Sequence, residues 1–118
     1  ISFAQSRKVG NQVVTHFQGV RWVVAELSTR LEAGMLLRDK AAWMEDRGLN
    51  PVRETSMAKL LAGEISMEVV SQAIQLTGSY GCYRDTPFER YLRDAKSLCI
   101  AGGTLEVMKN NIARQILG

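Results

Sequence analysis

The sequence has few of the residues from which metal sites, disulfide frameworks and membrane spans are built. Its 118 residues include one histidine and two cysteines, Cys82 and Cys99. Because the cysteines form no CxxC pair and have no cluster of other ligands nearby, they predict free thiols rather than a metal site. No apolar run approaches the ~20 residues of a membrane helix, and no signal peptide is visible. We therefore expect neither a metal site nor a membrane span.

The sequence also has only a small excess of positive over negative charge. Lys and Arg number 15 against 12 Asp and Glu, a net charge of +3, and the two signs are interleaved along the chain. Recognition of nucleic acid needs a concentrated basic surface, so the sequence predicts no such partner. The hydrophobic fraction of 46% is typical of a globular protein, and this length favours one domain.

Amphipathic helices are what the sequence has in abundance. Residues 1–7 read as the tail of a helix, and because the chain begins with Ile1 rather than Met, we expect a piece of a longer protein. Long helices are predicted over residues 13–47 and 54–76, separated by Gly48 and a following proline. Their apolar residues recur at steps of three and four: Phe17, Val20, Val24, Leu27, Leu31 and Met35, then Met57, Leu61, Ile65, Val69, Ala73 and Leu76.

Two shorter helices complete the predicted fold. Thr86 to Glu89 has the pattern of a capping box, with Thr86 as N-cap and Glu89 reaching back, and predicts a helix through Lys96. The last helix is predicted to begin at Thr104. No stretch alternates with period two, so essentially no β-sheet is expected. Residues 1–118 are therefore predicted to form one all-α domain, a four-helix up-down bundle.

Two glycine-rich turns, residues 77–81 and 102–104, lie beside helix ends. Glycine lets a ligand approach the backbone, and the free N–H groups at a helix N-terminus favour an anion or a carbonyl. An ordinary tight turn explains the same spacing. Arg90, Arg93 and Asp94 likewise fit either a phosphate or partner contact or a surface network of ion pairs, and His16 fits an ordinary packed or surface position.

Several segments resemble the C-terminal helical domain of the acyl-CoA dehydrogenases, a family of FAD enzymes. They are FAQSRK followed by Gln18, then AAWMEDRG, SMAKLLAGE, AIQLTGSYG, PFERYLRDAK and GGTLEVMKNNIARQILG, in the family's order and spacing. The resemblance implies a helical domain and a β-domain ahead of this one. It also implies a homo- or hetero-oligomer, a dimer of dimers, in which this domain reaches the FAD of another subunit.

The resemblance further implies which residues contact FAD. Different residues would serve the pyrophosphate, the adenine–ribose half and the flavin. They are Arg7 with Gln18 nearby at the pyrophosphate, Gln75, Gly78 and Ser79 at the adenine–ribose half, and Thr104 and Glu106 at the flavin.

The sequence departs from the family's pattern at three places. Gly10 and Asn11 stand where the family usually has Phe-Gly, and Gly78-Ser79 replaces a Gly-Gly pair. Most important, Gly102 stands where many members carry a catalytic Glu. That Glu removes the α-proton of the acyl thioester while hydride passes from the β-carbon to the flavin. Glycine cannot act as this base.

Three functions remain open from the resemblance. The first is the C-terminal domain of an FAD-dependent acyl-CoA dehydrogenase whose base lies upstream of Ile1. The second is a non-catalytic subunit or domain of a heteromeric acyl-CoA dehydrogenase. The third is a bundle that serves only protein interaction. The implied partners are an acyl-CoA substrate and an acceptor such as an electron-transfer flavoprotein. The implied location is the bacterial cytoplasm, or else the mitochondrial matrix.

Overall fold

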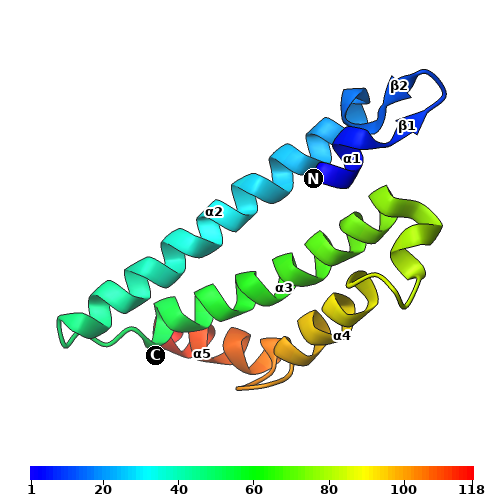
Figure 1. Cartoon of the computed structure of the whole chain (residues 1–118). Helices are drawn as coiled ribbons and strands as arrows, with labels where there is room; N and C mark the ends of the chain where they lie inside the picture. Colours follow the sequence, from blue (N-terminus) through cyan, green and yellow to red (C-terminus); the bar gives the residue numbers. More distant parts are fainter.

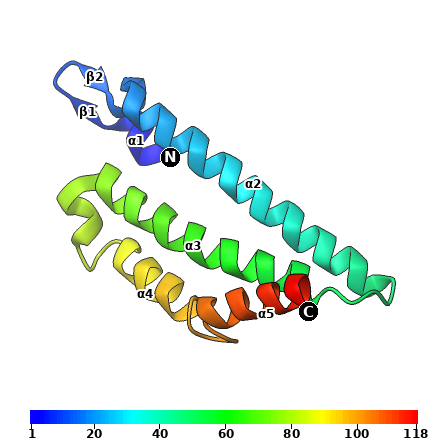
Figure 2. The same cartoon turned by 180° about the vertical axis from the view of Figure 1, so that it is seen from behind.

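The computed structural model describes all of residues 1–118 and is helical almost throughout. The long helices α2 (Gln18–Asp46) and α3 (Val52–Thr77) run antiparallel, while α4 (Phe88–Leu98) and α5 (Leu105–Leu117) follow one another along α3. Figures 1 and 2 show α3 between α2 and the α4–α5 pair. The predicted all-α class is confirmed, and α3 is the helix on which the other three assemble.

A short helix and a small hairpin precede α2. The hairpin turns at Gly10, whose φ of 60° suits the first central position of a tight hairpin turn. The long helix therefore begins at Gln18, not at Val13, and the expectation of no β-sheet is wrong for this one small hairpin. The elements here are α1 (Ser2–Ser6), β1 (Lys8–Val9), β2 (Gln12–Val13) and the 3-10 helix η1 (Val14–His16).

Helices α2 and α3 are in contact where Gly34 of α2 faces Ile65 of α3. A Cβ on Gly34 would lie 3.8 Å from Cδ1 of Ile65, which is the most completely buried large side chain, only 2% exposed. Nearby, Arg30 of α2 forms an ion pair with Glu68 of α3. The predicted apolar stripes thus meet at this crossing.

A buried carboxylate joins the other end of the two long helices. Glu54, in the first turn of α3, has only 4% of its side chain exposed and lies 2.7 Å from Nη2 of Arg53 and 3.2 Å from Nζ of Lys40. The hydrogen bond from Arg53, aided by Lys40, lowers the pKa of Glu54 from its ordinary 4.5 to about 2 despite burial, which acts in the opposite direction. Glu54 therefore stays ionised and pairs α3 with α2.

The start of α4 differs from the predicted capping box. The hydroxyl of Thr86 donates to the carbonyl of Tyr83 at 2.8 Å and closes the preceding turn, so it is not available as a cap. Pro87 is the N-cap, without a side-chain cap bond, and α4 begins at the next residue. Glu89 pairs with Arg93 one turn later at 3.1 Å instead of reaching back. The capping-box prediction is therefore wrong, although the helix it predicted is present.

The side of α2 away from α3 carries large apolar residues in the open. Trp22, Leu36 and Trp43 are all more than half exposed. Figures 1 and 2 show no other helix against this side of α2. Since only 13 of 118 residues are buried, the chain leaves much of its apolar surface uncovered.

Candidate functional site

Arg7 lies against the C-terminal end of α3. Its Nη1 donates a hydrogen bond to the carbonyl of Leu76 at 3.0 Å. Gly78, the C-cap of α3, has φ 65° and ψ −146°, a conformation that is essentially restricted to glycine. A Cβ at Gly78 would lie 3.1 Å from Nη1 and 3.2 Å from Nη2 of Arg7. The structure therefore brings the predicted Arg7 and Gly78 into contact; together with Leu76 they form what we call the Arg7 site.

The guanidinium of Arg7 has no acidic partner. Its side chain is half-buried, none of the ion pairs of the structure includes it, and the Leu76 carbonyl is its one hydrogen-bond acceptor. A guanidinium stays charged, and its planar fork of N–H groups matches the oxygens of a phosphate. The Arg7 site therefore suits an anionic ligand, and a phosphate best of all.

Aromatic rings extend the Arg7 site. The rings of Phe3 and Tyr80 stack with centroids 5.6 Å apart, and Tyr83 meets Tyr80 edge-on at 6.1 Å. The Arg7 guanidinium lies 5.8 Å from the Phe3 centroid. Sequence reasoning missed these rings because Phe3 and Tyr80 are far apart along the chain and neither belongs to a local pattern.

The other residues predicted for this half of the cofactor lie around or beyond the Arg7 site. Gln75, at the last turn of α3, and Ser79, in the 3-10 helix η2 (Gly78–Cys82), are both exposed. Gln18 is exposed at the start of α2. No hydrogen bond in the structure joins Gln18 to the Arg7 site.

A second predicted group lies in the turn of residues 102–106, which we call the Gly102 turn. Thr104, the predicted start of the last helix, is the N-cap of α5 and accepts a hydrogen bond from the backbone N–H of Val107 at 3.4 Å. The backbone N–H of Glu106 itself, and then the Thr104 hydroxyl, hold the pKa of the exposed Glu106 carboxyl below its ordinary value. Because this carboxylate already lies at the positive end of α5, the turn suits a second anion poorly.

Gly102 is not required by packing. Its φ is 68°, but a Cβ there would have no atom within 4 Å. At Gly103, with φ 102°, a Cβ would approach Cε of Met108 to 2.7 Å. Position 102 therefore faces open space, where a longer side chain could extend without a clash.

The Arg7 site and the Gly102 turn lie apart along α3. Leu105, within the Gly102 turn, and Cys99, just before it, pack on Gly63, whereas Arg7 packs on Gly78. At 1.5 Å per residue, Gly63 and Gly78 are separated by roughly 20 Å along the helix axis. The predicted cofactor contacts thus form two separate groups within one chain.

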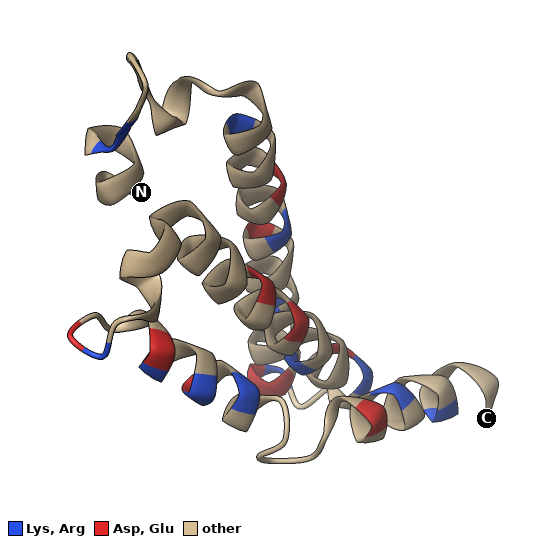
Figure 3. Cartoon of the chain, turned by 90° about the vertical axis from the view of Figure 1, so that its right-hand side faces the viewer, with Lys and Arg blue, Asp and Glu red and all other residues tan.

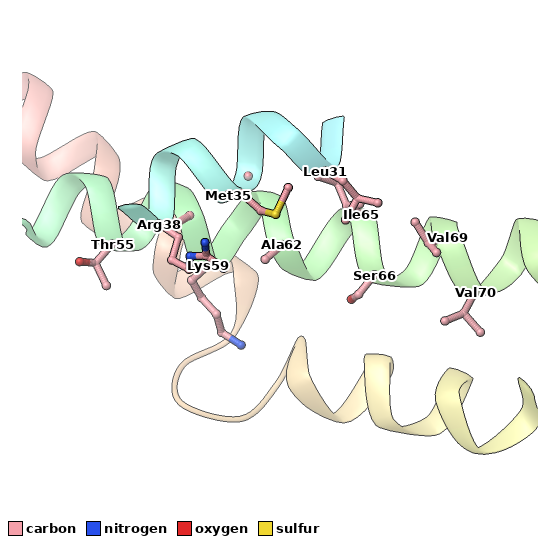
Figure 4. A pocket seen from close by; sticks show the side chains of 12 residues that line it. Leu31, Met35, Arg38, Thr55, Lys59, Ala62, Ile65, Ser66, Val69 and Val70 are labelled. Carbon is pink, nitrogen blue, oxygen red and sulfur yellow. The ribbon is translucent and has the colours of Figure 1, made fainter. Parts of the chain in front are cut away.

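Two apolar grooves run between α2 and α3. Figure 4 shows Leu31 and Met35 reaching from α2 toward Ile65 on α3, with Arg38 and Lys59 at one end. This groove has a volume of about 630 Å³. A second groove of about 710 Å³, nearer the N-terminus, is lined by Phe3, Val20, Leu27, Leu76 and Phe88 among others. Their lining suits an apolar chain or helix face and contains no group of catalytic side chains.

The short charged helix α4 resembles an ordinary solvated surface. Figure 3 shows acidic and basic residues side by side along it. Arg93 is paired with Glu89, and the guanidinium of Arg90 lies 5.6 Å from the ring centroid of Tyr91. Because both arginines have partners within the helix itself, a surface network accounts for these charges.

No group of three or more His, Cys, Asp or Glu side chains is arranged to hold a metal ion. None of the helices is both long enough and apolar enough to cross a membrane. Cys82 and Cys99 are free, as predicted, with Cys99 buried and donating to the carbonyl of Gly63 at 3.4 Å.

Comparisons with known proteins identify the family of this chain. The family model described as "Acyl-CoA dehydrogenase, C-terminal domain" matches residues 1–117. An acyl-CoA dehydrogenase of Bacillus subtilis is 36% identical over 118 residues, which are 100% of this chain and 31% of that protein. A 3-sulfinopropanoyl-CoA desulfinase of Paraburkholderia xenovorans is 34% identical over 118 residues, 100% of this chain and 30% of that protein.

Among solved structures, the butyryl-CoA dehydrogenase of Megasphaera elsdenii superimposes with a TM-score of 0.95. It is 28% identical, and the match covers 99% of this chain and 30% of that one. The chain therefore spans about 30% of the length of the relatives it matches. The match over residues 1–117, in sequence and in fold, shows that the chain belongs to the acyl-CoA dehydrogenase family, an FAD oxidoreductase family, as its C-terminal domain.

Proposed function

We propose that residues 1–118 are the C-terminal domain of a longer, FAD-dependent enzyme that acts on an acyl-CoA thioester. The observation that carries the proposal is the half-buried Arg7 guanidinium, which has no carboxylate partner and N–H groups to spare. A pyrophosphate would supply the missing negative charge. The family membership supports FAD as the source of that pyrophosphate.

The residues around the Arg7 site fit the adenosine half of FAD. Arg7 would hold the pyrophosphate, with Gln18 approaching from α2, and Gln75, Gly78 and Ser79 would face the adenine and ribose. The exposed amide of Gln75 and the exposed hydroxyl of Ser79 can each donate and accept hydrogen bonds, as ribose hydroxyls and adenine nitrogens require.

At the Gly102 turn, Thr104 and Glu106 would contact the flavin ring rather than a phosphate. The ionised carboxylate of Glu106 can accept a hydrogen bond from an N–H or hydroxyl but repels a second anion. When bound, the flavin accepts the hydride from the β-carbon of the substrate. This chain's own residues would orient the ring and leave the reacting face open.

The two groups of contacts would serve two FAD molecules. The pyrophosphate and the flavin ring of one FAD are joined only by a ribityl chain, which is too short for the roughly 20 Å between Gly63 and Gly78. In our proposal each domain therefore contributes to its own flavin site and to that of a neighbouring subunit. This spacing supports an oligomer such as a dimer of dimers, to which the exposed apolar side of α2 would contribute.

The α-proton of the substrate requires a base that this domain does not supply at position 102. Gly102 is exposed and has no side chain, and a Cβ there would meet no atom within 4 Å. In our main proposal the enzyme is a dehydrogenase, and its base comes from outside residues 1–118. The P. xenovorans relative is a desulfinase by name, so family membership alone does not decide between dehydrogenation and another reaction of an acyl-CoA. Dehydrogenation is therefore our proposal.

A second candidate is a non-catalytic subunit of a heteromeric dehydrogenase, and Gly102 is the observation that favours it. Such a subunit would keep the Arg7 site and the oligomer surface and would lack a base altogether. In both cases we expect a bacterial cytoplasmic location and an acceptor such as an electron-transfer flavoprotein.

Anaerobic titration of the full-length protein with acyl-CoAs of several lengths tests these proposals. We expect the purified protein to be yellow and its oxidised-flavin absorbance to bleach with at least one acyl-CoA. Bound flavin that never bleaches would favour the non-catalytic subunit, and Gly102→Glu would then show whether a carboxylate restores bleaching. A colourless protein that releases no flavin on denaturation would contradict both candidates.

A further inference from the structure

The contact between Gly78 and Arg7 results from the packing of the protein itself and is present without a ligand. Its φ of 65° and ψ of −146° end α3 and turn the chain into η2, and its bare Cα faces the guanidinium. A Cβ would come within 3.1 Å of Nη1, 3.2 Å of Nη2 and 3.6 Å of Cζ. These are all atoms of the planar group, so a Cβ at position 78 would shift the guanidinium by a few tenths of an ångström and disturb its orientation.

Two further contacts hold the guanidinium and leave its other N–H groups free. The carbonyl of Leu76 accepts from Nη1 at 3.0 Å, and the ring of Phe3 lies 5.8 Å from Cζ. Phe3 is itself stacked on Tyr80, which η2 carries. The guanidinium is therefore held by the end of α3, by α1 and by η2 before any anion arrives.

We propose that Gly78 is a positioning residue that acts through Arg7: its missing side chain leaves room for the Arg7 guanidinium, oriented by the Leu76 carbonyl, to present its free N–H groups to the FAD pyrophosphate. This proposal rests on the proposed function of Arg7 as the pyrophosphate-binding residue. It differs from a direct contact between Gly78 and the adenine–ribose half, which would not depend on Arg7. An oriented fork loses less freedom on binding, so orientation adds to affinity as well as to geometry.

A double-mutant cycle separates the two roles of Gly78. FAD is titrated into the deflavinated full-length protein and followed by flavin fluorescence, in the parent, Gly78→Ala, Arg7→Ala and the double variant. We expect Gly78→Ala to raise the FAD dissociation constant roughly tenfold, the range of a lost charge-assisted hydrogen bond. In the Arg7→Ala background the same substitution should have almost no further effect. A full additional loss in that background would overturn the proposal.

Gly48→Ala is the control for backbone strain. Gly48 has φ 68°, but a Cβ there meets no atom within 4 Å, and it lies beyond the opposite end of α2. We expect its FAD affinity to stay within about twofold of the parent's. An equal loss in Gly48→Ala would mean that the Gly78 effect reports strain alone and would contradict the role of Arg7.

Arg7→Lys keeps the test decisive if Gly78→Ala fails to fold. A lysine carries the charge but lacks the planar fork that packs on Gly78, so we expect its FAD affinity to fall nearly as far as that of Arg7→Ala. Affinity within about twofold of the parent's would overturn the proposal, because a point charge would then suffice. If Arg7→Ala itself leaves affinity unchanged, the proposed function of Arg7 fails instead, and the two failures are thereby distinguished.

Discussion

The Arg7 site and the Gly102 turn are both glycine turns beside helix ends, yet they differ in charge. At the Arg7 site a half-buried cation lacks a partner and a glycine makes room for it. At the Gly102 turn an ionised Glu106 already lies at the helix N-terminus, and Gly102 touches nothing. The spacing of glycines therefore does not indicate which ligand a turn binds. The sign of the unpaired charge beside the turn does.

Reversing the charge at Arg7 should have the largest effect. Arg7→Glu places a carboxylate where the pyrophosphate is proposed to bind, so we expect the full-length protein to purify without FAD. Flavin content after extensive dialysis is the measurement. Arg47→Glu is the matched control, because the Arg47 guanidinium lies only over the ring of Trp43, 4.7 Å from its centroid. Equal FAD retention in Arg7→Glu and Arg47→Glu would contradict the proposal that Arg7 binds the pyrophosphate.

Glu54 should affect stability without affecting either site. Removing its charge in Glu54→Gln leaves Lys40 and Arg53 without their shared partner, and we expect a loss of about 2 kcal/mol in the free energy of unfolding. Urea denaturation measures this loss, and FAD affinity should be unchanged. A marked loss of FAD affinity would show that the sites depend on the α2–α3 crossing.

The same residue predicts how stability depends on pH. Because folding lowers the pKa of Glu54 from 4.5 to about 2, its contribution is fully present above pH 4.5 and is lost as the pH falls toward 2. The difference in stability between the parent and Glu54→Gln should therefore shrink over that window. A difference that stays constant between pH 5 and the acid limit would contradict the assigned pKa.

Replacing Gly78 or Gly102 by alanine tests whether the two turns also differ in packing. Gly78 and Gly102 have positive φ values of 65° and 68°, so each substitution should cost stability from the backbone alone, and more at Gly78, whose ψ of −146° places it in a region essentially restricted to glycine. Only Gly78→Ala also crowds a neighbour, so we expect it to destabilise more than Gly102→Ala in urea denaturation. Equal losses would contradict both the backbone strain at Gly78 and its crowding of the Arg7 guanidinium.

Glu106→Gln should have the smallest effect on stability. Its carboxylate is fully exposed, and a glutamine amide can still accept from the backbone at the start of α5. We expect a slight destabilisation that appears above the ordinary pKa of the carboxyl and fades as the pH falls, because the lowered pKa marks the ionised form as the stabilising one. Thermal unfolding monitored by circular dichroism at neutral and acidic pH checks this sign.

The helices of this fold could be predicted from sequence because their apolar residues recur with helical spacing. Gly48 and Thr104 were identified correctly as a helix end and a helix start, since each satisfies local backbone groups. Thr86 misled the prediction because its hydroxyl had a competing local acceptor in Tyr83. The short hairpin around Gly10 was missed because two-residue strands have too few residues to show a period.

Only part of the candidate site could be predicted from the sequence. Resemblance pointed to Arg7 and Gly78 separately, but nothing local relates residues this far apart in the chain. Their contact depends on α1 and the end of α3 meeting in space, as does the stacking of Phe3 on Tyr80. The separation of the Gly102 turn from the Arg7 site likewise follows from where each packs along α3.

A structure of the full-length protein with FAD bound tests the central claim most directly. We predict a pyrophosphate oxygen within about 3 Å of a free N–H group of Arg7, with Nη1 still bonded to the Leu76 carbonyl and the guanidinium against Gly78. A bound FAD whose pyrophosphate lies elsewhere, with Arg7 paired to a carboxylate from another part of the protein, would contradict the account.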